Sequence, residues 1–149
     1  MRANRGALVV YKKNKIINDY FERKLEEEFQ ELDRRMYKRK LIIAEEHNER
    51  GILNSGIFAS ALFQMIIDEL FDACKVSLNL IDTFQETNNL SFSDKQLRKI
   101  SLLYSSRYKM KFKENIRNNL ESSTKYVNES TFIKLFTKRI QALRLQSGL

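Results

Sequence analysis

A row of basic side chains between positions 95 and 117 has the clearest capacity for chemistry. Its members are Lys95, Lys99, Lys109, Lys113 and Arg117. At 100° per residue they share one face of a helix, opposite an apolar stripe, and extend along about 33 Å of helix axis. Arg107 and Lys111 widen this field from the side. Such a row can follow a nucleic-acid backbone, because each neutralised phosphate releases counterions. The alternative interpretation is a solvated basic face without a ligand.

A second basic cluster lies in residues 34–40, where five of the seven side chains are cationic. Its candidate phosphate ligands are Arg34, Arg35 and Lys38, which lie away from the apolar seam of the helix expected there. Glutamates of the preceding turns can pair with Arg34 and Arg35 at i, i+3 or i, i+4 spacing. The cluster therefore either supports the row at 95–117 or forms an internally paired helix surface.

Three further residues are candidates for catalysis or metal binding. His47 is the only histidine, so a two-histidine metal site is excluded, and we expect it to be exposed at a helix end. Glu69 falls on an apolar helix arc, where a carboxylate needs a partner, so we expect an ion pair or an exposed edge position. Cys74, on the same arc, is expected to be a buried thiol. The sequence predicts a non-enzymatic protein without a metal or cofactor.

The composition indicates one globular domain. The chain has 149 residues and a formal net charge of +8, with 31% charged and 42% hydrophobic residues. The charge is uneven, with a net +3 in residues 1–50, −4 in 51–90 and +9 in 91–149. No run approaches the roughly 20 apolar residues of a membrane span, so we expect no membrane partner. A single cysteine forms no internal disulfide, which favours a reducing, cytoplasmic setting.

The chain lacks proline and has four glycines, which favours long helices over a sheet with frequent turns. We expect a basic N-terminal arm, an edge strand or tail, over residues 1–12 and a single helical-bundle domain over 13–149. The first helix, expected over 14–50, has a narrow apolar seam, although Ile16, Ile17, Leu41 and Ile42 near its ends lie off that seam. The second, over 57–86, has an apolar arc of roughly 240°, typical of a central helix.

The remaining elements complete an all-α, antiparallel bundle of about four helices, of which the first two are long. Ser93 and Gln96 have the spacing of a capping box and predict the start of a third helix that ends near residue 120. Its aromatic stripe of Tyr104, Tyr108 and Phe112 is expected to lie in the core, with the tyrosine hydroxyls at the rim. A fourth helix is expected over residues 131–145.

These features lead to two functional hypotheses. The first is a helical module that binds nucleic acid through backbone phosphates, with little base specificity, because no base-reading motif is present. The second is a protein–protein interaction module, an adaptor, inhibitor or assembly subunit, whose basic face meets an acidic protein. The wide apolar arc of the second helix and the off-seam residues of the first leave apolar surface to cover, which favours a homodimer or a larger assembly.

Overall fold

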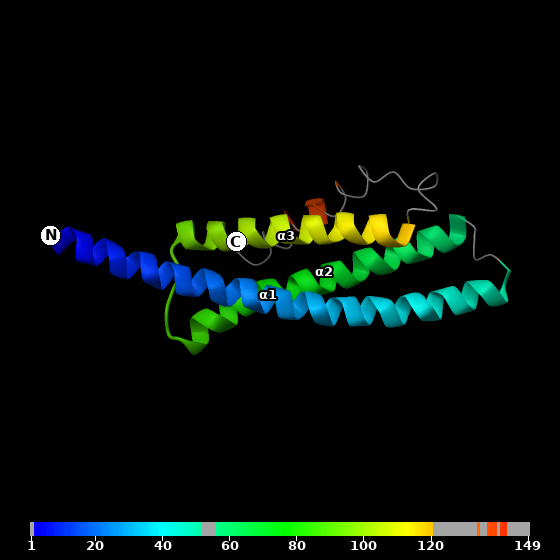
Figure 1. Cartoon of the computed structure of the whole chain (residues 1–149), viewed down its shortest axis with the longest axis horizontal. Helices are drawn as coiled ribbons and strands as arrows, with labels where there is room; N and C mark the ends of the chain where they lie inside the picture. Colours follow the sequence, from blue (N-terminus) through cyan, green and yellow to red (C-terminus); the bar gives the residue numbers. More distant parts are fainter. Residues whose placement is uncertain (1, 52–55, 121–133, 135–136, 140, 143–149) are drawn as a thin grey trace.

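Three long helices make up most of this computed structural model, which describes residues 2–51, 56–120, 134, 137–139 and 141–142 (Figure 1). They are α1 (Arg2–Glu49), α2 (Gly56–Thr87) and α3 (Asp94–Leu120). Each runs antiparallel to the next, and α2 packs along both of the others, whereas α1 and α3 lie farther from each other (Figure 1). The expected all-α antiparallel bundle with a central second helix is confirmed.

The first helix is longer than expected. It begins at Arg2, so residues 2–12 are helical and do not form the edge strand or tail predicted for the N-terminal arm. Val9 and Val10 favour a strand, but a β-branched residue disfavours a helix by only about 0.7 kcal/mol or less. Because the chain has no proline, nothing stops the helix before Glu49, and the expected boundary at residues 12 and 13 falls inside it.

The turns between helices follow from local chemistry. Gly51 ends α1 at a positive φ of 72°, and Asn89 ends α2 at a φ of 49°. The amide of Leu90 donates to the carbonyl of Gln85 at 3.0 Å, and that of Asn89 to Glu86 at 3.2 Å. This pair of bonds is a Schellman motif with asparagine in the left-handed position.

The predicted capping box begins α3. The amide of Gln96 donates to Ser93 Oγ at 3.2 Å, and the amide of Ser93 donates to Gln96 Oε1 at 2.9 Å. Two otherwise unpaired amides are thus satisfied reciprocally. The fourth helix expected over 131–145 falls largely outside the described residues, although the described positions 137–139 and 141–142 are helical.

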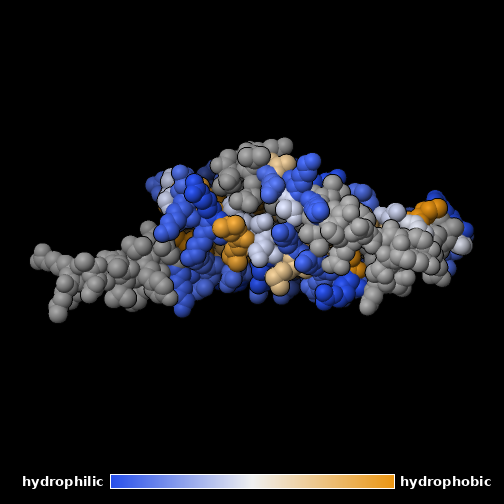
Figure 2. All heavy atoms as spheres, turned by 90° about the horizontal axis from the view of Figure 1, so that it is seen from above, coloured by the Kyte–Doolittle hydropathy of each residue, from blue (hydrophilic) through white to orange (hydrophobic). Residues whose placement is uncertain are grey.

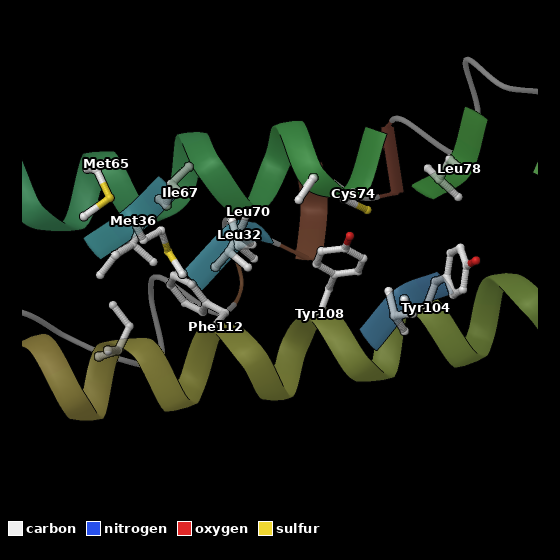
Figure 3. Packing of buried hydrophobic residues seen from close by; sticks show 14 of the residues in the cluster. Leu32, Met36, Met65, Ile67, Leu70, Cys74, Leu78, Tyr104, Tyr108 and Phe112 are labelled. Atoms are coloured by element: carbon white, nitrogen blue, oxygen red, sulfur yellow. The ribbon is translucent and has the colours of Figure 1, made fainter. Parts of the chain in front are cut away.

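Aromatic side chains join the three helices in the core. Phe21 of α1 is fully buried and contacts Phe84 of α2, with ring centroids 5.2 Å apart, and Tyr104 of α3 at 6.2 Å. Farther along, Phe29 packs edge-on against Tyr108 at 5.0 Å. Figure 3 shows Tyr104, Tyr108 and Phe112 reaching from α3 into the space between α1 and α2. The apolar face of α3 is therefore fixed inward, and its opposite face is turned to solvent.

Candidate nucleic-acid interface

The five residues of the row at 95–117 lie on the outer face of α3, and we call them the basic row. All five are exposed: Lys95, Lys99, Lys109, Lys113 and Arg117. They are held outward because the opposite face of α3 carries the buried Tyr104, Tyr108 and Phe112. Within the described part of the chain, no carboxylate lies within ion-pair distance of any member of the row. None of the five is therefore neutralised by an ion pair with a described residue.

Two exposed apolar residues share the face with the basic row. Leu102 and Met110 are each 64% exposed. Relative to Leu97 they lie at about 140° and 220°, within or beside the arc of the lysines. Helical spacing in the sequence alone is enough to place them on this face. In Figure 2, which views the molecule from the α3 side, the coloured residues are mostly hydrophilic, with a few hydrophobic ones among them.

The two flanking candidates are engaged with α1. Lys111 Nζ lies 2.8 Å from Asp33 Oδ1 and 5.5 Å from the centre of the Phe29 ring. Its side chain is only 12% exposed. Arg107 lies 3.8 Å from Glu26. Both residues therefore join α3 to α1, and their charges are partly compensated before any ligand arrives.

The cluster on α1 is mostly paired as well. Arg34 contacts Glu31 at 2.6 Å with the expected i, i+3 spacing. Arg35 instead contacts Glu28 at 3.0 Å and Glu69 of α2 at 3.1 Å. Burial lowers the pKa of Arg35, but the hydrogen bonds to these two glutamates outweigh it and raise the pKa above its ordinary value. Among the three candidates only Lys38 is exposed without an ion pair to a described residue.

Glu69 accepts the hydrogen bonds of a small ion-pair network. An ion pair is one of the two environments that the sequence predicted for it. Its carboxylate accepts from Arg35 Nε at 3.1 Å and from Arg39 Nη1 at 3.0 Å. The Glu69 side chain is 11% exposed, whereas the two arginines are 41% and 45% exposed. The largely buried charge is thus neutralised by two guanidinium groups that reach it from α1.

His47 is not the exposed residue that we expected. It is buried, its Nδ1 donates to the carbonyl of Ile43 at 2.7 Å, and its ring lies 5.4 Å from that of Phe58. The sequence did not reveal that the first turns of α2 would cover the last turn of α1. With Nδ1 hydrogen-bonded and the ring packed against Phe58, His47 is a packing residue. Cys74 is buried, as predicted.

The described residues contain no group of three or more histidines, cysteines or acidic residues that could hold a metal ion. None of the described helices has an apolar stretch long enough to cross a bilayer. Comparison of the chain with protein-family models, with curated proteins and with solved structures found no match.

Several hollows lie beside the described helices. One, of about 510 Å³, is a groove between α1 and α2 whose walls include Glu27 and Glu31 on one side and Val76 and Leu80 on the other. Another, of about 450 Å³, lies where α3 begins, and Lys95 and Lys99 line it together with Ile17, Asn18 and Ser93. The sequence predicted neither hollow, because both depend on how the helices diverge.

Proposed function

We propose that the protein binds nucleic acid through contacts between the basic row of α3 and backbone phosphates. The observation that carries the proposal is the contrast between the row and the other candidates. The five side chains of the row are exposed and have no ion pair among the described residues, whereas Arg34, Arg35, Arg107 and Lys111 are each paired with a carboxylate. Unpaired, exposed cations on a rigid helix are those that phosphates can neutralise.

The experiment is a titration of labelled single- and double-stranded DNA and RNA, followed by fluorescence anisotropy. Five phosphate contacts give a log–log salt slope of about −4.5, which corresponds to a loss of roughly 500-fold in affinity between about 50 and about 200 mM salt. We expect similar affinities for unrelated sequences, because phosphate contacts carry no base information. No binding at low salt by the folded protein would refute the proposal.

A matched pair of variants separates the basic row from net charge. In Lys109→Glu/Lys113→Glu/Arg117→Glu, at most two contacts remain, so the affinity should fall and its loss over the same salt range should drop to about tenfold. The control, Lys15→Glu/Arg50→Glu/Lys75→Glu, makes the same change in charge at exposed positions on α1, in the turn after it and on α2. It should keep most of the affinity and the steep slope. Equal losses in the two variants would mean that only the overall charge matters.

Leu102 and Met110 favour a second candidate function, the docking of an acidic protein. Phosphates gain nothing from an exposed aliphatic side chain, whereas protein interfaces centre on apolar anchors surrounded by polar contacts. The variant Leu102→Ser/Met110→Ser distinguishes the two functions. The affinity for nucleic acid should stay within about twofold of the wild type. Docking to an acidic protein should weaken by tenfold or more, because an apolar anchor of an interface typically contributes over about 1 kcal/mol.

A further inference from the structure

We propose that the groove between α1 and α2 is a docking site for the basic face of α3 in a second copy of the chain. The inference does not rest on nucleic-acid binding. It names the partner of the second candidate function, namely the groove with an acidic rim on another copy of the chain. It starts from the groove of about 510 Å³, which the basic row does not touch.

The groove combines an acidic rim with an apolar wall. Glu27 and Glu31 form the rim on α1, with side chains 57% and 54% exposed. Each has one cationic neighbour on its own helix: Glu27 has Lys24, which also lines the groove, and Glu31 has Arg34. A carboxylate has about four acceptor sites, so each glutamate can take another donor. On α2 the wall includes Val76, which is exposed, and Leu80, which is half-buried.

The outer face of α3 is complementary to this groove in charge and in spacing. Lys109 and Lys113 are four residues apart, as are Glu27 and Glu31, so each pair spans about 6 Å along its helix. Two lysines can therefore meet two glutamates in register. Leu102, about two turns before the lysine pair, and Met110, beside it, lie on the same face and can cover the exposed Val76. The pairing would bury the apolar surface that each face now leaves in water.

The two surfaces point in opposite directions on one molecule. Ser77 lines the groove, and its hydroxyl is hydrogen-bonded at 2.8 Å to Tyr108, which reaches it from α3 across the core. Hence α3 lies behind the floor of the groove, and its basic face is turned away from the groove opening. Two copies cannot dock reciprocally in a closed dimer. The contact is head-to-tail and adds further copies, as heterologous interfaces do unless the rotation closes a ring.

The test is sedimentation velocity of the full chain over a wide concentration range, at about 0.1 M and about 1 M salt, where the Debye length falls from about 10 to about 3 Å. We expect the mean mass to rise beyond that of a dimer with concentration at the lower salt, with association at least tenfold weaker at the higher salt. A protein that stays monomeric at all concentrations in the lower salt would overturn the inference.

Reversing the charge on either surface gives the decisive comparison. A groove variant, Glu27→Lys/Glu31→Lys, and a face variant, Lys109→Glu/Lys113→Glu, should each lose self-association by tenfold or more. Mixing the two variants should restore it, because each then meets a surface of opposite sign. The control Glu45→Lys/Glu46→Lys places the same charge change about 21 Å farther along α1 and should associate like the wild type.

Two outcomes would contradict the assignment of the groove as the docking site. These are undiminished association of the groove variant, or a mixture that associates no better than either variant alone. If circular dichroism shows that the groove variant is unfolded, Glu27→Gln/Glu31→Gln replaces it, with the same loss expected. The groove variant should bind nucleic acid at least as well as the wild type, so failure of self-association and failure of nucleic-acid binding are seen separately.

Discussion

The hydroxyl of Tyr108 on α3 lies 2.8 Å from Oγ of Ser77 on α2, and both residues are buried. One turn earlier on α3, the hydroxyl of Tyr104 is equally buried but has no hydrogen-bond partner among the described residues. Two tyrosines of one helix face thus differ in a single interaction. They also lie deeper than the rim position expected from the sequence, because α2 closes over both rings (Figure 3).

Replacing each tyrosine by phenylalanine should have opposite effects on stability. Tyr108→Phe removes a buried hydrogen bond and leaves Ser77 unpaired, so we expect a loss of about 1–2 kcal/mol in the free energy of unfolding. Tyr104→Phe removes an unpaired hydroxyl and should be neutral or stabilising by up to about 1 kcal/mol. Urea unfolding followed by circular dichroism measures both. Equal losses would show that the Ser77 contact contributes nothing specific.

The same two tyrosines predict how stability falls in alkali. Burial raises the pKa of Tyr104 and of Tyr108 above the ordinary value, and for Tyr108 the bond to Ser77 offsets only part of this rise. Because the folded state holds these protons more tightly, their contribution is complete below about pH 10 and is lost as the pH rises above that value, where tyrosines of the unfolded chain ionise. The slope is about 1.4 kcal/mol per pH unit for each tyrosine.

Unfolding free energies measured between about pH 9 and about pH 12 test this prediction. Tyr108→Phe should halve the slope above about pH 10. Tyr37→Phe, which removes an exposed tyrosine hydroxyl, is the matched control. A wild-type stability that stays flat across the range would contradict the assignment.

The ion-pair network around Glu69 should respond asymmetrically to substitution. Arg35→Met/Arg39→Met leaves a largely buried carboxylate without a cation, which we expect to destabilise the fold by about 3 kcal/mol. Glu69→Gln leaves two arginines that are themselves nearly half exposed, so water can solvate them and the loss should be about 1 kcal/mol. Chemical denaturation of the variants gives both values. A larger loss for Glu69→Gln would refute the asymmetry.

Lys111 and Lys113 are two residues apart and should behave differently. Lys111→Ala removes the pair with Asp33 and the contact with Phe29, and should lower stability by about 1 kcal/mol. Lys113→Ala should change stability by less than about 0.5 kcal/mol but reduce the salt slope of nucleic-acid binding by about 0.9. Thermal melts and anisotropy titrations of the two variants make the comparison. If Lys111→Ala reduced the salt slope and Lys113→Ala lowered the stability, then Lys111 would belong to the nucleic-acid interface and Lys113 to the contacts that stabilise the fold.

Local chemistry in the sequence was sufficient to predict the start of α3 and the central place of α2. The capping box needs only Ser93 and Gln96, and the apolar arc of α2 needs only helical spacing. The cross-helix partners could not be predicted in this way. That Arg35 bonds to Glu69, and that Lys111 bonds to Asp33, depends on the register between helices, which side-chain packing determines.

The same limit applies at the candidate site. Helical spacing placed the basic row on one face of α3. It could not show that the row has no ion pairs with described residues whereas Arg107 and Lys111 are paired, because the partners of these two lie on α1. His47 was expected at an exposed helix end because its own neighbours are polar. Its burial comes from Phe58, on a different helix.

The unequal lengths of the helices affect how the molecule moves in solution. At 1.5 Å per residue, the 48 residues of α1 extend about 72 Å, against about 40 Å for the 27 residues of α3. One end of α1 projects beyond its neighbours (Figure 1). Such a rod experiences more friction when it turns end over end than when it spins about its long axis. The backbone N–H bonds of α1 point along that axis, so their NMR relaxation reports the slow end-over-end rotation. For the same reason the protein sediments more slowly than a sphere of equal mass.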